Sequence, residues 1–405
     1  MKRRVAITGL GLVTPIGIGK ELFWDALIAG KSGIKNIRGF DTSHYHTSMG
    51  GEIQDFNPAE YLTAEEIEIL DRVTHFSIAA ARMALDDAKL PGGPNDGKRS
   101  GIILGTSTAA NNASYCKKWV QEGFRSIQYT DIIKYRPETI TDYLAIKYGC
   151  RGRTALFVNA CAAGTYAVGE SFELIRRGKA DFMMAGGSET ISETVMCGFS
   201  NTRSLASGMC RPFDKNRDGL LISEGAAVII LESLDQAIAR NAHIYGEVAG
   251  YGLSCDAYHM TAPDISGQGA SLSMRAALDD AGVSIDDVDY ISAHGTGTPL
   301  NDKMETTASK SVFGNRAYEI PMSSIKSTLG HTFGASGAIE LAACALILER
   351  GIIPPTINYQ QPDPECDLDY VPNAAIEKTV RVAMSNSYAF GGNNASLIVK
   401  KYSTL

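Results

Sequence analysis

The chain has 405 residues, of which 44% are hydrophobic and 20% are charged, and its formal net charge at pH 7 is −7. This composition is typical of a globular enzyme, and the acidic balance argues against a general nucleic-acid-binding protein, which normally carries a basic surplus. No apolar run approaches the ~18 residues that a membrane-spanning helix needs. We therefore expect no nucleic-acid or membrane partner, and either two or three domains or one large duplicated fold.

The first predicted strand covers residues 5–8 and is expected to enter a glycine turn. Gly9, Gly11 and Pro15 interrupt the apolar run, so the segment is not expected to act as a signal peptide. The letters G-L-G-L-V-T also suggest a dinucleotide-binding turn. We reject that interpretation because Thr14 stands where the third glycine would be, and no acidic residue closes a second strand at the right distance.

Farther along, short β-rich runs alternate with longer helical patterns, which predicts an α/β protein. Predicted strands cover residues 5–8, 101–104, 155–158, 182–185, 227–231, 290–293, 322–325 and 397–400. Predicted helices cover residues 76–88, 165–177, 269–281 and 335–350. The strands near the carboxyl end also resemble hairpins, so we expect mixed sheets. No low-complexity segment or long linker separates these elements, which argues against loosely tethered domains.

A weak internal repeat points to duplication. S-G-I-I-L-G-T-S-T (100–108) and Y-I-S-A-H-G-T-G-T (290–298) are both apolar strands that end in G-T-x-T. C-A-A-G-T at 161 and H-T-F-G-A at 331 each open a helix that closes on a basic residue and a glycine, which is a helix-stop signal. Both pairs come in the same order, which predicts two similar halves with one reactive residue at each helix entrance. G-T-x-T is short enough for chance similarity, so that alternative stays open.

Cys161 follows an apolar strand and precedes a helical pattern in which Val168, Phe172 and Ile175 share one face. A helix start presents free N–H groups and a partial positive charge, which favour a thiolate. The alanines and glycine around Cys161 leave room for a bulky partner at the sulfur. From these residues alone, a nucleophile and a buried structural cysteine remain equally good interpretations. The other cysteines, at positions 116, 150, 197, 210, 255, 344 and 366, form no C-x-x-C pair and no zinc-ligand spacing, so we expect reduced thiols and no metal site.

Two histidines stand in glycine-rich turns. His294 directly follows an apolar strand, at the end where α/β proteins usually bind ligands, and His331 lies in a strand-to-helix turn. Taken singly, each is more often structural than catalytic. Lys326 and Glu305 lie near these turns and could equally be solvated surface charges. The pair Gly391-Gly392 permits positive φ and a close ligand approach, but it is also typical of a hairpin turn.

With Cys161, the ordered motifs H-G-T-G-T, K-S-T-L-G-H and F-G-G-N-N resemble those of β-ketoacyl-acyl carrier protein synthases of type II fatty acid synthesis and their type II polyketide relatives. The likeness covers nearly the whole chain and includes R-P-F-D-K-N-R-D-G, A-Y-H-M-T-A-P and P-E-C-D-L-D-Y-V-P. It implies a thiolase fold in which two similar βαβ-type halves stack in αβαβα layers, and it implies a dimer. The halves would be residues 1–250, with the nucleophile, and 251–405, with the histidines, the lysine and the gate loop, in one compact unit.

The resemblance also implies a role for each candidate residue. Cys161, His294 and His331 would form the catalytic triad, and Lys326, paired with Glu305, would orient His331. Phe390 would gate the site together with Gly391 and Gly392, and the backbone N–H groups of Cys161 and Phe390 would form the oxyanion hole. The remaining expectations are the pantetheine-binding hydroxyls Thr296 and Thr298 and the acyl-pocket residue Thr108. No metal or organic cofactor is implied, because acyl carrier protein delivers both substrates on its phosphopantetheine arm.

Several positions depart from the family pattern. Glu65, Glu66 and Glu68 stand where basic residues usually help to dock the acidic carrier, so we expect docking on other residues or on a partner subunit. Thr108 replaces an isoleucine of the acyl pocket, and Ala389 replaces a glycine, which could restrict the gate loop. Ser223 also replaces a glycine, and the sequence offers no physical account of that change.

The polar pocket favours a condensing enzyme of type II polyketide or polyene biosynthesis over a housekeeping fatty acid elongation enzyme. We expect it to be cytoplasmic, as a homodimer or as a heterodimer with a chain-length-factor-like subunit. A non-catalytic chain-length factor would lack the nucleophile. A thiolase would need a second cysteine near Gly391-Gly392, where the sequence shows none, and a cysteine hydrolase or a scaffold protein would not explain two histidine loops and Lys326.

Overall fold

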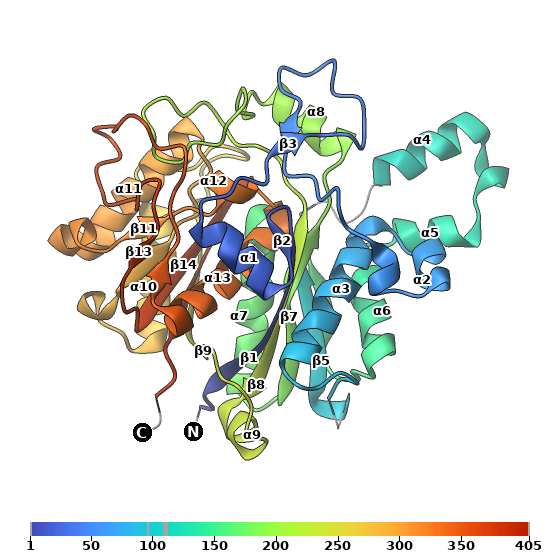
Figure 1. Cartoon of the computed structure of the whole chain (residues 1–405), viewed down its shortest axis with the longest axis horizontal. Coiled ribbons are helices and arrows are strands. Elements are labelled where there is room, and N and C mark those ends of the chain that lie inside the picture. The colour runs from blue at the N-terminus through green and yellow to red at the C-terminus, as the bar shows by residue number, and fades with distance from the viewer. Residues whose placement is uncertain (1, 95–96, 108–111, 404–405) are drawn as a thin grey trace.

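The computed structural model describes residues 2–94, 97–107 and 112–403 (Figure 1). Its centre is an eleven-stranded sheet whose strands follow the order β11-β10-β14-β15-β9-β1-β8-β7-β5-β6, with β2 (Gly17–Ile18) beside β1. The strands of one half are β6 (Thr154–Phe157), β5 (Ser100–Gly105), β7 (Phe182–Glu189), β8 (Gly225–Ser233) and β1 (Val5–Thr14). Those of the other half are β11 (Met322–Ser323), β10 (Tyr290–Ser292), β14 (Val382–Ala389), β15 (Asn393–Lys400) and β9 (Gly246–Cys255).

The two five-strand sets repeat one topology. In each set the first three strands are parallel and the last two pair antiparallel with their neighbours. Among the described residues, strand pairing joins the two sets only at β1 and β9, over three residues of each strand. The sequence repeat falls on equivalent positions, β5 and β10, so the predicted duplication and the mixed sheet are confirmed. The division at residues 250 and 251 stays a prediction, and that boundary falls inside β9.

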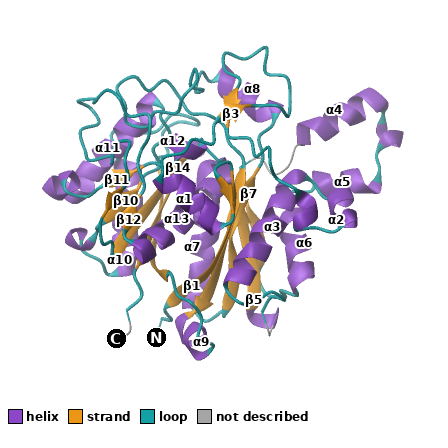
Figure 2. Cartoon of the chain, viewed as in Figure 1, coloured by secondary structure: helices purple, strands orange, loops and turns teal. Residues whose placement is uncertain are grey.

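Helices form three layers around these strands (Figure 2). α7 (Ala163–Arg176) and α13 (Ser336–Arg350) pack on each other and on strands of both halves. α3 (Arg72–Asp87) and α6 (Thr139–Tyr148) cover the outer face of the first half, and α10 (Gln268–Ala281), with α11 (Pro299–Phe313) beside it, covers that of the second. Every residue of α13 from 336 to 348 is buried, as expected of a helix that is apolar on all sides. The architecture is the predicted αβαβα arrangement.

The first strand is longer than the sequence suggests. β1 continues through Gly9 and Gly11 to Thr14, so the glycine turn expected after residue 8 is wrong. These glycines are needed because α3 crosses the strand: a Cβ on Gly9 would lie 2.2 Å from the carbonyl oxygen of Ala84, and one on Gly11 would lie 1.9 Å from that of Ala80. The glycines therefore serve close helix–sheet packing rather than a turn.

The remaining elements lie mostly around the rim. They are α1 (Lys20–Ile28), α2 (Ala64–Ile69), α4 (Asn112–Glu122), α5 (Tyr129–Tyr135), α8 (Glu193–Asn201), α9 (Leu234–Ala239), α12 (Lys326–Leu329), and the short strands β3 (Lys35–Asn36), β4 (Met49–Gly50), β12 (Ile352–Ile353) and β13 (Ile376–Glu377). Figure 1 shows α4 and α5 projecting from the body as an arm. Within the described residues, no helix is both long enough and apolar enough to cross a membrane.

Candidate active site

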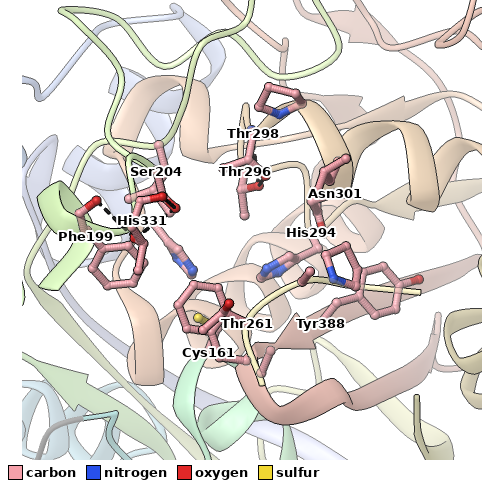
Figure 3. A pocket seen from close by; sticks show the side chains of 18 of the residues that line it. Cys161, Phe199, Ser204, Thr261, His294, Thr296, Thr298, Asn301, His331 and Tyr388 are labelled. Atoms are coloured by element: carbon pink, nitrogen blue, oxygen red, sulfur yellow. Dashed lines mark hydrogen bonds between the residues drawn. The ribbon is translucent and has the colours of Figure 1, made fainter. Parts of the chain in front are cut away.

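A cavity of about 360 Å³ lies where the two halves meet at the starts of α7 and α13 (Figure 3). Its lining includes Cys161, His294 and His331, so the structure brings together three residues that are far apart in the sequence. Thr296, Thr298 and Phe390 also line it. Among the residues that the structure describes, no group of three histidine, cysteine or acidic side chains could hold a metal ion. Thr108, the expected acyl-pocket residue, lies outside the described residues.

Cys161 lies in a 3₁₀ turn (Ala160–Ala162) that leads directly into α7. Ala160 adopts a φ of +54°, a left-handed conformation that costs a non-glycine residue energy and is typical of functional turns. Burial raises the pKa of the Cys161 thiol to about 12, and the nearby Lys326 ammonium acts in the opposite direction. Burial thus acts against the helix-start effect, and it favours the protonated thiol over the thiolate at rest.

His294 and His331 face each other across the cavity. Their ring centroids are 5.4 Å apart and the ring planes are nearly perpendicular, at 81°. Both side chains are buried, with at most 2% of their surface exposed. Burial, followed by the charge of Lys326, holds the pKa of each imidazole well below its usual value. Both histidines are therefore neutral at pH 7, as hydrogen-bond donors to a developing oxyanion should be.

The hydrogen bonds assign the same tautomer to both rings. The Lys326 ammonium lies 3.5 Å from Nδ1 of His294. Nδ1 of His331 accepts from the backbone N–H of Phe333 at 3.3 Å and lies 3.0 Å from the hydroxyl of Ser336, which can donate to it as well. Because an ammonium and a backbone N–H can only donate, each Nδ1 is an acceptor and each proton is on Nε2. Nε2 of His331 is buried and has no hydrogen-bond partner among the described residues. Figure 3 shows both imidazoles reaching into the cavity beside Cys161.

The expected pairing of Lys326 with Glu305 is wrong. Lys326 begins α12, and its ammonium donates to the carboxylate of Glu340 on α13 and to the backbone carbonyl of His294, the latter at 2.6 Å. Both members of the ion pair are almost fully buried. Lys326 therefore orients His294 and not His331. Glu340 was missed, although a single acidic residue within the apolar segment A-S-G-A-I-E-L-A-A-C-A-L is a signal that could have identified it.

Glu305 has a different partner set. It projects from α11, and its carboxylate accepts hydrogen bonds from the backbone N–H groups of His294 and Gly295, both at 2.8 Å. Burial raises the pKa of Glu305 to about 8, against the effect of these two donors. Glu305 thus fixes the backbone turn that carries His294. Neither Lys326 nor Glu305 is a solvated surface charge.

Phe390, the expected gate residue, lines the cavity and belongs to a row of stacked aromatic rings. Phe390 stacks on Phe199 with centroids 5.5 Å apart, and Phe199 stacks on Phe333 at 5.1 Å. Gly391 and Gly392 have φ values of +82° and +72°, which explains why glycine occupies both positions.

Ala389 has φ and ψ values of −130° and 157°, an extended conformation that any residue adopts. The observed conformation therefore does not require glycine at this position, and the expected restriction of loop movement by Ala389 stays a prediction. Ser223 also has an explanation: its hydroxyl donates to the carbonyl of Gly51 at 3.1 Å, and a Cβ on Gly51 would lie 2.2 Å from that hydroxyl oxygen. Serine at 223 thus depends on glycine at 51.

The two threonines that are expected to bind pantetheine lie at the cavity wall. The hydroxyls of Thr296 and Thr298 are 2.8 Å apart.

The sulfur of Cys255 lies 3.7 Å from the carbonyl oxygen of Gly391, so the expectation that no cysteine stands near Gly391-Gly392 is wrong. Strand pairing of β9 with β15 brings the two together across a long sequence separation. Cys255 is exposed and is not among the described residues that line the cavity, so it does not supply a thiolase-type second cysteine.

Comparison with known proteins agrees with this geometry. The family model for the N-terminal domain of β-ketoacyl synthases matches residues 2–237, and the model for the C-terminal domain matches residues 245–360. The 3-oxoacyl-[acyl-carrier-protein] synthases 2 of Synechocystis sp. and Staphylococcus aureus are each 40% identical to the chain, over 99% of both sequences.

Solved structures are similar over the full length. The structure described as the ishigamide ketosynthase/chain length factor matches with a TM-score of 0.94 and 38% identity, and both chains are covered completely. A type II polyketide ketosynthase, solved with a bound hexaketide and in complex with its acyl-carrier protein, matches with a TM-score of 0.91 and 34% identity, again over both whole chains.

Proposed function

The chain belongs to the β-ketoacyl synthase family of condensing acyltransferases, and from that premise we propose how its own residues carry the condensation. Cys161 attacks the thioester of an acyl group on a carrier protein and holds the chain covalently. Its proton passes to the departing carrier sulfur as the acyl–carrier bond breaks. The backbone N–H groups of Cys161 and Phe390 stabilise the tetrahedral oxyanion.

The second half-reaction uses the histidine pair. Malonyl-carrier loses carbon dioxide, and the electron pair of the broken bond forms an enolate on the thioester. The Nε2–H groups of His294 and His331 donate to the enolate oxygen as its charge develops. The enolate carbon then attacks the acyl carbonyl on Cys161, and the sulfur leaves with its electron pair and takes up a proton from solvent, which restores the thiol. The products are a β-ketoacyl-carrier, carbon dioxide and free enzyme.

One observation carries this proposal: two neutral imidazoles with the same tautomer flank the nucleophile in a buried cavity. A cysteine hydrolase would need one histidine as a base, and a second buried donor would have no task. The proposal is tested by measuring carbon dioxide release from malonyl-carrier with His294→Ala and His331→Ala. Each variant should lose about 10²-fold or more of the rate, whereas decarboxylation that survives both substitutions would refute the assignment.

For the pathway, we propose type II polyketide or polyene biosynthesis. The likeness to the ishigamide and hexaketide-bound ketosynthases supports this proposal, and the likeness to the 3-oxoacyl-carrier synthases 2 supports fatty acid elongation as the second candidate. The ratio of kcat/KM for polyunsaturated and saturated acyl-carriers of equal length decides between them. Preference for the unsaturated chain is expected, and equal or better use of the saturated chain would favour elongation.

We also propose a second subunit on the projecting arm, either another copy of the chain or a chain-length-factor-like relative. The arm exposes Val120 and Phe124, with 85% and 86% of their surface accessible, and Tyr129 nearby. Large apolar side chains gathered on a projecting element are typical of an interface. The molecular mass in solution distinguishes a homodimer, a heterodimer and a monomer. It is measured for the chain alone and after co-expression with the proteins encoded by neighbouring genes.

The carrier protein is the proposed partner at the cavity mouth. Arg203 is exposed and lines the cavity, where its charge suits the phosphate of a phosphopantetheine arm. Thr296 and Thr298 line the same passage with paired hydroxyls that suit the amides of that arm. We expect carrier affinity to depend on Arg203 more than on the acidic helix α2.

A further inference from the structure

Glu189 is a buried acidic residue for which the condensation has no task. It ends β7 and exposes 1% of its surface. Its Oε2 accepts hydrogen bonds from the backbone N–H groups of Ser107, at 2.6 Å, and of Gly334, at 3.2 Å. Removing a carboxylate from water is costly unless hydrogen bonds or a cation compensate it, so these hydrogen bonds help to hold Glu189 in place.

The two N–H groups belong to different halves of the molecule. Ser107 follows β5, whose end packs directly against the start of the nucleophile helix: a Cβ on Gly105 would lie 2.2 Å from the carbonyl carbon of Ala163. Gly334 belongs to the turn between His331 and α13. The two turns also touch each other, since a Cβ on Gly334 would lie 2.4 Å from the Cα of Thr106. One carboxylate therefore bonds both backbone segments that adjoin the nucleophile and His331.

A second buried glutamate, Glu305, bonds backbone N–H groups on the opposite side of the site in a comparable way. There, Glu305 accepts from two successive backbone N–H groups and fixes the turn of His294. Glu189 differs because the two backbone N–H groups that donate to its Oε2 come from separate halves, so these bonds fix the position of one half relative to the other.

We propose that Glu189 is a positioning residue that sets the placement of the Cys161 helix relative to His331. This inference rests on the proposed roles of Cys161 and His331. A misplacement of about 1 Å between reacting groups can cost two orders of magnitude in rate, so the reach of this side chain matters for condensation.

The charge of Glu189 acts on the sulfur. The groups that bear on Cys161 are Lys326, whose ammonium lowers the pKa of the thiol, and Glu189 and Glu340, whose carboxylates raise it. His294 and His331 are neutral and contribute no charge. A thiol that stays protonated at rest is protected against oxidation and stray electrophiles, because the thiolate is the reactive form.

Two variants separate the effect of the Glu189 side-chain length from the effect of its charge. Glu189→Gln keeps the length and an acceptor oxygen but removes the charge, whereas Glu189→Asp keeps the charge and shortens the side chain. The first readout is the pH dependence of Cys161 alkylation by iodoacetamide, followed by mass measurement of the peptide that contains Cys161, because the exposed Cys116, Cys197 and Cys255 also react. The second readout is the rate of β-ketoacyl-carrier formation, and thermal unfolding identifies variants that do not fold.

Glu189→Gln should lower the midpoint of Cys161 alkylation by about one pH unit and keep the condensation rate within about threefold. Glu189→Asp should keep the midpoint within about half a unit and lose about tenfold or more in condensation. An unchanged midpoint in Glu189→Gln, or an unchanged rate in Glu189→Asp, would overturn the inference. If Cys161→Ala still condenses, the proposed function itself fails, and this result differs from either result that would overturn the role of Glu189.

Discussion

Lys326 and His294 are joined twice: the lysine ammonium donates to the backbone carbonyl of His294 at 2.6 Å and lies 3.5 Å from Nδ1 of its ring. The second contact keeps the imidazole proton on Nε2, the atom that a developing enolate needs. Glu340 on α13 compensates the buried lysine charge. The orientation of His294 thus depends on the Lys326–Glu340 ion pair, which joins α12 to α13.

Removal of one member of this pair should destabilise the fold and abolish condensation. Lys326→Met leaves the carboxylate of Glu340 buried without its cation, which costs about 3–5 kcal/mol of unfolding free energy. The double variant Lys326→Met/Glu340→Leu removes both charges and should recover most of that stability in urea unfolding, but not the decarboxylation rate. Recovery of the rate together with the stability would show that Lys326 has no part in orienting His294.

The neutral state of the histidines predicts a specific pH dependence. Because burial and Lys326 hold the pKa of both imidazoles well below 6.5, the unfolded chain takes up protons first as the pH falls below about 6.5. Stability contributed by a neutral buried histidine is therefore lost as the pH falls through that region. The native chain should lose stability relative to His331→Asn between pH 6.5 and 5, measured by urea unfolding. A constant difference across that range would contradict a depressed pKa.

Phe390, for which a gating role is expected, should control loss of the bound acyl group to water. Phe390→Ala removes the ring that stacks on Phe199 and opens the cavity, so hydrolysis of acyl-Cys161 should increase several-fold while condensation falls. Phe390→Leu, which restores apolar bulk, serves as the matched control and should hydrolyse less than the alanine variant. Timed mass measurement of the acyl-enzyme in the absence of malonyl-carrier gives the rate. Equal hydrolysis in native enzyme and Phe390→Ala would show that this ring does not seal the cavity.

Carrier docking should be insensitive to the exposed acidic residues of α2 and sensitive to Arg203. Glu65→Lys/Glu68→Lys changes two exposed side chains, so KM for acyl-carrier should change less than about twofold and stability by less than about 0.5 kcal/mol. Arg203→Ala should raise that KM several-fold, an effect that weakens at high salt. A large decrease of KM in the lysine variant would place docking at α2 instead.

Glu66 is unsuitable for that experiment. It is buried, and its carboxylate accepts hydrogen bonds from the backbone N–H of Thr63 and the hydroxyl of Tyr143 and forms an ion pair with Lys147. Glu66→Lys should therefore cost about 3 kcal/mol or more of stability, which urea unfolding measures. From the sequence alone, Glu66 looks like part of a charged surface. In the structure its side chain links α2 to α6.

Much of the fold and the centre of the site could be predicted from the sequence. Hydrophobic periodicity and turn residues predicted most strands of the central sheet. The ordered motifs identified Cys161, His294 and His331. β14 was missed because its segment Ser385-Asn386-Ser387 is polar although all three residues are buried, which hides the strand pattern. Lys326–Glu340, Glu189 and the passage of β1 beneath α3 depend on the packing of segments far apart in the chain, which no local pattern reveals.

The central claim is tested most directly by following one acyl group through both half-reactions. The enzyme is incubated with a labelled acyl-carrier, the peptide containing Cys161 is weighed, and malonyl-carrier is then added. We expect one acyl group on Cys161, followed by its stoichiometric transfer into β-ketoacyl-carrier with release of carbon dioxide, and no acylation or product with Cys161→Ala. An acyl group found on another residue, or condensation by Cys161→Ala, would contradict the account.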